Sequence, residues 1–299
     1  MSPNKNYGLR ETLPRAGAHI FGSAKLPIIM QNRSWAGFLP QFEAQSDGLF
    51  DSYSCVTFAT FNCLETYLLY LNIQKNFSDR FTAVMSGTLP NVGNYIDAPG
   101  RSIANDGIVD EKEYPFVSGE KYFETVPKDT RAQAKKNIGF WNMQSEWVDW
   151  SGCETERLWD ALQYSPLAVT VLAWYPQKDG MYQNTGSDKT NHVVMLFAGE
   201  YKKWWLIYDH YEQSIKKLSW DFYFGSAMKH ILLPRMLQLV KGDKSIDIFA
   251  VSPKGTKHLV FDEAQFEAGV EIGLWKREYE TLKQKDVDAL SQGKAIVLA

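Results

Sequence analysis

The pattern of apolar residues changes from helical to strand-like about halfway along the chain. Between residues 55 and 73 the apolar positions recur at spacings of three and four, which predicts a long buried helix that begins at Cys55. Shorter helices are expected over 78–85, with Ser78 as the N-cap, and over 101–105, 128–137 and 154–164. Strand-like runs cover 138–150, 167–174, 192–198, 203–208, 214–218 and 229–233. A helix-rich first half and a strand-rich second half predict an α+β architecture in two lobes.

Three segments are expected from the same pattern. Residues 1–34, rich in Pro, Gly and polar residues, are interpreted as an extended N-terminal arm, and residues 35–233 as the main domain, in which 90–99 form a loop. Residues 234–299 restart the pattern with a hairpin-like turn at 252–256 and a helix at 263–268. This C-terminal module is small enough to need docking onto another surface.

Composition and charge narrow the possible function classes. A net charge of −3 and a pI near 6.0 give no electrostatic reason to expect nucleic acid as a partner. No run approaches the roughly 18 consecutive apolar residues of a membrane span. Three cysteines and five dispersed histidines predict neither a disulfide framework nor a structural metal, and no cofactor motif is present. The expected compartment at synthesis is therefore the reducing cytoplasm.

Cys55 is the candidate nucleophile. In the first helical turn, free backbone N–H groups and the positive end of the helix dipole favour a thiolate. Such a thiol needs a base and a group that orients the base. His192 begins an apolar strand and is the candidate base, and Asp209 ends the next strand, so a hairpin returns its carboxylate beside His192. The neighbouring His210 is expected to point the other way.

These residues resemble the papain-like cysteine peptidases, in which the nucleophile Cys precedes a distant His and then an orienting amide or acid. The resemblance covers roughly residues 35–232 and rests on five short pieces in the family's order. The pieces are the nucleophile Cys55, the stretch from Gly107 to Tyr114-Pro115-Phe116, Ser165 through Val169, Asn191-His192-Val193-Val194, and Trp205 through Asp209-His210-Tyr211. The residues around the nucleophile, Asp51 through Val56, depart from the family's usual motif.

The resemblance implies a fold and an activity. It implies a helical lobe that carries the Cys helix, an antiparallel β-barrel-like lobe that carries His and Asp, and hydrolysis of peptide bonds in a peptide or protein substrate through a Cys55 thioacyl intermediate. Carried over by position, the side-chain amide of Gln45 and the Cys55 N–H would bind the oxyanion, with Gln41 as the alternative. Gly93 and Asn94 would form a wall of the substrate cleft, and Tyr211 would pack over the His–Asp pair.

Several features depart from the family pattern. Gln45 lies ten residues before Cys55, so the intervening loop must fold back for the oxyanion site to close. Asp209 takes the place of the family's Asn, and the disulfide beside the nucleophile is absent. No inhibitory propeptide is expected, because only about thirty-five residues precede the main domain. This style of variant is similar to the papain-like chains that bacteriophages encode, which implies a virion-associated location.

Two other interpretations stay open. A structural virion or assembly protein could keep the peptidase fold without activity and assemble through its N-terminal arm and its C-terminal module, in which Trp275 has an exposed-looking position. The other is a different Cys-His-Asp enzyme, such as a transglutaminase-like acyltransferase or a cell-wall amidopeptidase. Of the remaining thiols, Cys63 falls on the buried side of the helix and is interpreted as core, and Cys153 as an incidental loop residue.

Overall fold

The computed structural model describes most of the chain. It covers all residues except 1–4, 23–27, 140, 176, 212–213, 235–237, 252–255, 261, 272–274, 276 and 294–299. None of the helices within this part is both long and apolar enough to cross a membrane.

The helical lobe follows the predicted order of elements. Ser78 caps α2 as expected, because its hydroxyl oxygen accepts a hydrogen bond from the N–H of Phe81 at 3.0 Å. The α-helices of this lobe are α1 (Cys55–Tyr70), α2 (Asp79–Met85), α3 (Ala98–Asp106) and α4 (Lys128–Ile138), and three short 3-10 helices cover Ala36–Phe38, Glu111–Glu113 and Glu120–Phe123.

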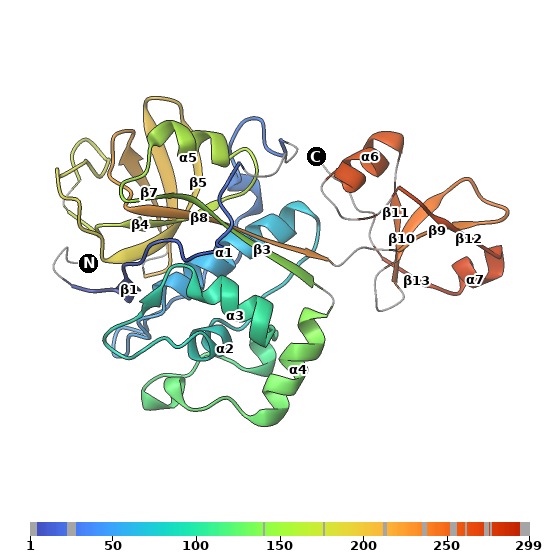
Figure 1. The fold of residues 1–299 in the computed structure, drawn as a ribbon, viewed down its shortest axis with the longest axis horizontal. Coiled ribbons are helices and arrows are strands. Elements are labelled where there is room, and N and C mark those ends of the chain that lie inside the picture. The colour runs from blue at the N-terminus through green and yellow to red at the C-terminus, as the bar shows by residue number, and fades with distance from the viewer. Residues whose placement is uncertain are drawn as a thin grey trace.

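Helix α1 is the central element of the molecule. It lies between the smaller helices and the large sheet (Figure 1), and all of its residues except Leu69 are buried. A helix that is apolar on every side is stable only when it is covered on every side. The buried helix predicted from the sequence is therefore confirmed, with Cys55 as its first residue and Cys63 in the core.

The second lobe is a six-stranded antiparallel sheet in the order β3-β8-β4-β5-β6-β7. Its strands are β3 (Trp141–Trp150), β4 (Leu167–Val171), β5 (His192–Glu200), β6 (Trp204–Asp209), β7 (Ser214–Ser219) and β8 (Ser226–Pro234), and α5 (Thr155–Ala161) packs beside β3. The β5–β6 hairpin pairs Met195 with Tyr208, so it returns the end of β6 to the start of β5. This register brings Asp209, at the end of β6, beside His192, at the start of β5.

Two short strands lie where only irregular structure was expected. Strand β1 (Leu9–Arg10) belongs to the N-terminal arm, and β2 (Asn94–Tyr95) belongs to the segment predicted as a loop. The two strands pair in parallel, with Leu9 opposite Asn94. The arm is therefore attached to the body of the protein through backbone hydrogen bonds, a pairing that no local sequence pattern encodes.

The C-terminal module has its own five-stranded sheet, in the order β12-β9-β10-β11-β13, which lies apart from the two lobes in Figure 1. Its elements are β9 (Gln238–Gly242), β10 (Ile248–Val251), β11 (Thr256–Val260), α6 (Glu263–Glu271), β12 (Glu280–Leu282), α7 (Gln284–Asp288) and β13 (Ser291–Gln292). The turn predicted at 252–256 lies almost wholly outside the described residues. The expectation of an exposed Trp275 is wrong: its ring is 1% exposed, and its Nε1–H donates to the Phe266 carbonyl.

Buried carboxyl groups in the helical lobe make stability depend on pH. Burial and the nearby Glu43 carboxylate raise the pKa of Glu111 from 4.5 to about 7. The folded state then binds the proton more tightly than the unfolded state, so stability falls as the pH rises from about 4.5 to about 7. We expect Glu111→Gln to lose less stability across this window, raising the melting temperature at pH 8 by about 2–4 °C relative to the parent.

Thermal melts at pH 4.5 and pH 8 check this expectation. Gln keeps the acceptor oxygen that receives the Phe116 N–H, so the substitution removes the titration and keeps the contact. Glu113→Gln, an exposed position on the same 3-10 helix, is the matched control and should follow the parent. Equal pH dependence in Glu111→Gln and the parent would contradict the assignment.

Candidate active site

The Cys55 thiol lies at the junction of the two lobes. The residue is the first of α1 and is fully buried, and its sulfur accepts hydrogen bonds from the backbone N–H groups of Val193 and Val56. The Val193 contact places the sulfur at the residue that follows His192 on β5. Burial raises the pKa of the thiol above its usual range. The closed site therefore favours the neutral thiol.

His192 and Asp209 form the predicted pair. The His192 Nε2 atom lies 3.2 Å from Asp209 Oδ1, and both side chains are fully buried. Within the described part of the chain, no group hydrogen-bonds the other ring nitrogen, Nδ1. A carboxylate on one imidazole nitrogen fixes the tautomer and leaves the second nitrogen for proton exchange.

Asp209 is held as an ionised carboxylate by more groups than the sequence predicted. Its Oδ1 also accepts the Tyr211 N–H at 3.1 Å, and its Oδ2 accepts from Trp174 Nε1 at 2.8 Å and from Lys216 Nζ at 3.0 Å. Burial alone would raise the pKa of Asp209, but the hydrogen bond with His192 and the charge of Lys216 hold it well below its usual range. Trp174 and Lys216 were not expected from sequence, because neither belongs to the short pieces that resemble the family.

His210 does not point away from the pair, as the strand alternation suggested. Its ring lies 5.0 Å from the His192 ring and 5.5 Å from Phe58, centroid to centroid. Burial lowers the pKa of His210 to about 3, so this imidazole stays neutral. Burial against α1 overrides the alternation at the strand end.

His192, Asp209 and His210 are also the one group in the described chain whose metal-ligating atoms all lie within 4.8 Å of one another. The four donors that already fill the Asp209 carboxylate include the Lys216 ammonium, which would repel a cation. The donor set therefore fits an orienting acid better than a metal ligand.

The loop before Cys55 folds back in the way that the oxyanion assignment requires. The Gln45 N–H donates to the His210 carbonyl at 3.1 Å, and the Gln45 carbonyl accepts from both the N–H and the hydroxyl of Ser52. A bridge between Ser46 and Asp51 closes the base of the loop. These contacts compensate for the long gap between Gln45 and the nucleophile.

The Gln45 amide is aimed at a backbone carbonyl. Its Nε2 lies 3.1 Å from the Tyr7 carbonyl oxygen, 3.0 Å from Asp51 Oδ1 and 2.5 Å from the Tyr211 hydroxyl. Since the carbonyl and the carboxylate are acceptors only, the NH₂ side of the amide must face them. Gln45 is fully buried in the site, whereas the alternative, Gln41, is exposed.

The N-terminal arm covers this site. The Tyr7 N–H donates to the Asn191 carbonyl at 2.9 Å, and the Asn191 side chain donates to the Lys5 carbonyl at 2.7 Å. The Tyr7 ring lies 5.3 Å from the His192 ring and 5.0 Å from the Tyr211 ring. The short arm therefore lies across the site.

The residues predicted for the cleft wall border the arm. The Asn94 N–H donates to the Gly8 carbonyl at 2.8 Å. A Cβ atom at Gly93 would lie 1.9 Å from the Gly8 oxygen, and one at Gly8 would lie 2.1 Å from the Tyr53 oxygen. Both glycines have positive φ. The cleft thus holds an extended peptide segment in direct backbone contact.

Tyr211 packs against His192, as the family position implies, with ring centroids 5.3 Å apart. Its hydroxyl adds a contact that the resemblance did not predict, since it donates to the Asp51 carboxylate at 2.7–2.8 Å. Asp51 and Tyr7 were both missed. Asp51 could have been noticed as an acid four positions before the nucleophile, whereas nothing local marks Tyr7.

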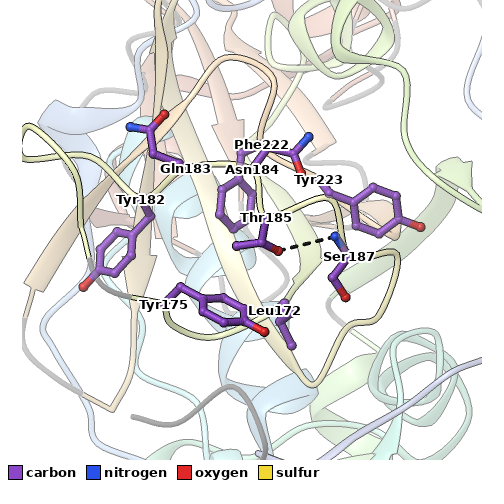
Figure 2. Close-up of a pocket in the computed structure, with 9 residues that line it drawn as sticks. All are labelled: Leu172, Tyr175, Tyr182, Gln183, Asn184, Thr185, Ser187, Phe222 and Tyr223. Atoms are coloured by element: carbon purple, nitrogen blue, oxygen red, sulfur yellow. Dashed lines mark hydrogen bonds between the residues drawn. The ribbon is translucent and has the colours of Figure 1, made fainter.

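Figure 2 shows a second hollow, whose lining includes Tyr182 and Thr185. Tyr182 in its wall packs on Trp174 with ring centroids 5.1 Å apart, and the Thr185 hydroxyl accepts the Ser187 N–H at 3.4 Å. The lining consists of Leu172, Tyr175, Tyr182, Gln183, Asn184, Thr185, Ser187, Phe222 and Tyr223. None of these side chains is a base or acid near neutral pH. This lining therefore offers no group for acid–base chemistry near neutral pH.

Solved structures similar to this one are papain-like cysteine proteases. Procathepsin L2 from the larval midgut of Tenebrio molitor superposes with a TM-score of 0.55 at 16% identity, covering 77% of this chain and 79% of that chain. A recombinant stem bromelain precursor gives a TM-score of 0.53 at 16% identity, with 78% and 80% covered. The bromelain protease from Ananas comosus, in complex with the E64 inhibitor, gives 0.50 at 15% identity, with 66% and 97% covered.

No protein-family model matches the chain, and no curated protein sequence matches it. At the identities found, the structural likeness shows the fold. The two-lobe, papain-like α+β fold predicted from the sequence is therefore confirmed.

Proposed function

We propose that this chain is a cysteine peptidase with a Cys55–His192–Asp209 triad, in which Gln45 is an oxyanion donor. The observation that carries the proposal is the placement of a peptide backbone in the site: the Gln45 amide donates to the Tyr7 carbonyl, and the Tyr7 ring packs on His192. A cleft that binds an extended peptide beside a thiol and an imidazole–carboxylate pair suits hydrolysis of peptide bonds.

The proposed reaction is an acyl transfer in two steps. The Cys55 thiol gives its proton to His192 Nδ1, and the sulfur attacks the carbonyl carbon of the substrate. Gln45 Nε2 and the Cys55 backbone N–H stabilise the resulting oxyanion, and the imidazolium returns its proton to the leaving amine. Water, deprotonated by His192, then attacks the thioester and restores the thiol. Asp209 keeps the imidazole oriented throughout.

The enzyme is proposed to be latent while the arm fills the cleft. Cys55, His192 and Gln45 are all fully buried, and Tyr7, which covers them, is 2% exposed. No substrate carbonyl can reach the sulfur until residues 5–10 move. Two of the similar structures, the procathepsin and the bromelain precursor, are precursor forms as well, which is consistent with this state. Opening the cleft would also hydrate the thiol and lower its pKa.

Labelling of the thiol tests the proposal. A peptide library is digested by a chain in which Gly8→Ala loosens the arm, before and after treatment with an epoxide or iodoacetamide, and the adduct is located by mass spectrometry. We expect cleavage to fall in proportion to the fraction of Cys55 labelled. Cys153→Ser is the matched control for labelling at the partly buried second thiol. Cleavage that survives complete labelling of Cys55 would refute the mechanism, and no cleavage by a chain whose arm has been released would favour the structural alternative.

A further inference from the structure

The ammonium group of Lys5 lies in a small binding site beside the triad. Its Nζ is 2.8 Å from Asp51 Oδ2 and faces three aromatic rings, with centroids at 5.1 Å for Tyr7, 5.7 Å for Tyr211 and 5.9 Å for Tyr53. Tyrosine faces and a carboxylate together are the surroundings that proteins use to bind ammonium ions. The arm therefore places the Lys5 ammonium beside a carboxylate and tyrosine rings that suit the binding of a cation.

Most of the residues that surround the Lys5 ammonium do not belong to the arm. Asp51, Tyr53 and Tyr211 belong to the body of the protein, and only Tyr7 and Lys5 belong to the arm. The Asp51 carboxylate is 11% exposed and is fixed by the Tyr211 hydroxyl, the Tyr53 N–H and the Gln45 amide. A carboxylate held by three groups of the body does not depend on Lys5 for its orientation.

The position of the site ties it to the reaction. Gln45 Nε2 contacts both Asp51 and the Tyr7 carbonyl, so one amide links the cation site to the oxyanion position. Beyond Lys5 lies an open groove of about 750 Å³, whose wall also carries Glu120 and Phe123. A peptide that enters from this groove meets acidic and aromatic side chains first.

We propose that Asp51, Tyr53 and Tyr211 form a subsite for the basic side chain of a bound peptide, lysine or arginine, and that Lys5 is its internal occupant. The inference rests on the proposed function, because it names a substrate class for that cleft. It also assigns Lys5 as an anchor of the arm. Partial burial by itself lowers the pKa of Lys5. The hydrogen bond and the charge of Asp51 raise this pKa by more than burial lowers it, so the Lys5 ammonium stays charged.

Protection of Cys55 from alkylation tests the subsite in the full chain. Lys5→Met, which keeps the length of the side chain but removes the charge, should make iodoacetamide react with Cys55 about tenfold faster at fixed pH, as loss of one ion pair and its cation–π contacts implies. Lys112→Met, at an exposed position away from the site, is the control and should react as the parent does.

Peptides added in trans then test the chemistry of recognition. In the Lys5→Met chain, acetyl-Lys-Asn-Tyr-Gly-Leu-Arg-amide should protect Cys55 at a concentration several-fold lower than the same peptide with norleucine in place of lysine. With Asp51→Asn added, the two peptides should protect alike. Alkylation of Lys5→Met at the parent rate, or equal protection by the two peptides with Asp51 intact, would overturn the proposal. None of these measurements needs peptide cleavage. If lysine-dependent protection is found in a chain that cleaves no peptide, the subsite is supported and only the proposed peptidase function is refuted.

Discussion

Replacing His192 with Ala is expected to lower kcat/KM for peptide cleavage by at least about 10³-fold. General acid–base catalysis by a positioned histidine contributes roughly 10²–10⁴-fold, and here the same imidazole must also generate the thiolate. The loss should appear mainly in kcat, because His192 is buried beneath Tyr7 and its proposed role is to transfer protons rather than to bind the peptide. The rate is measured with one peptide from the library, in a Gly8→Ala background that loosens the arm.

The variant should remain folded, which makes the result interpretable. Asp209 keeps the N–H groups of Trp174 and Tyr211 and the Lys216 ammonium, so its charge stays compensated when the imidazole is removed. His19→Ala, an exposed histidine of the arm, is the control and should keep the parent rate. A His192→Ala chain with a melting temperature near that of the parent and a kcat/KM within tenfold of it would remove His192 from the mechanism.

The elements that carry the proposed triad were predictable because their patterns are local. The spacing of apolar residues after Cys55 specifies a buried helix, and the run that begins at His192 specifies a buried strand. The hairpin that returns Asp209 to His192 follows from two adjacent strands joined by a short turn. Each of these inferences needs information from only a few neighbouring residues, and the order of the three residues along the chain then supplied the site.

The surroundings of the triad could not be predicted in the same way. Trp174 and Lys216 reach Asp209 from β-lobe segments on either side of the hairpin, and their contacts depend on how those segments pack. The pairing of Leu9 with Asn94 joins segments far apart in the sequence that have no strand periodicity. The nearest local sequence signal for this pairing is Gly8. Its lack of a side chain permits close backbone contact, but it does not indicate which segment makes that contact.

Displacing the arm from the cleft is expected to have the second large effect, an increase in the rate of peptide cleavage of about tenfold or more. Gly8 has φ of +109°, and a Cβ atom there would meet the Tyr53 carbonyl oxygen at 2.1 Å, so Gly8→Ala cannot be accommodated with the arm in the cleft. The Tyr53 backbone belongs to the loop that carries Asp51 and leads into Cys55, and this loop is fixed by Gln45 and Ser52. The arm is therefore the part that must move.

Gly17→Ala is the control that separates displacement of the arm from the effect of backbone strain alone. Gly17 lies in the same arm with φ of +81°, but a Cβ atom there would have no neighbour within 4 Å. Both substitutions cost conformational energy in the arm, yet only Gly8→Ala clashes with the cleft. We therefore expect faster cleavage and faster alkylation of Cys55 in Gly8→Ala, and parent rates in Gly17→Ala. Equal rates in all three chains would mean that residues 5–10 do not control access to the thiol, and the latency would have to arise elsewhere.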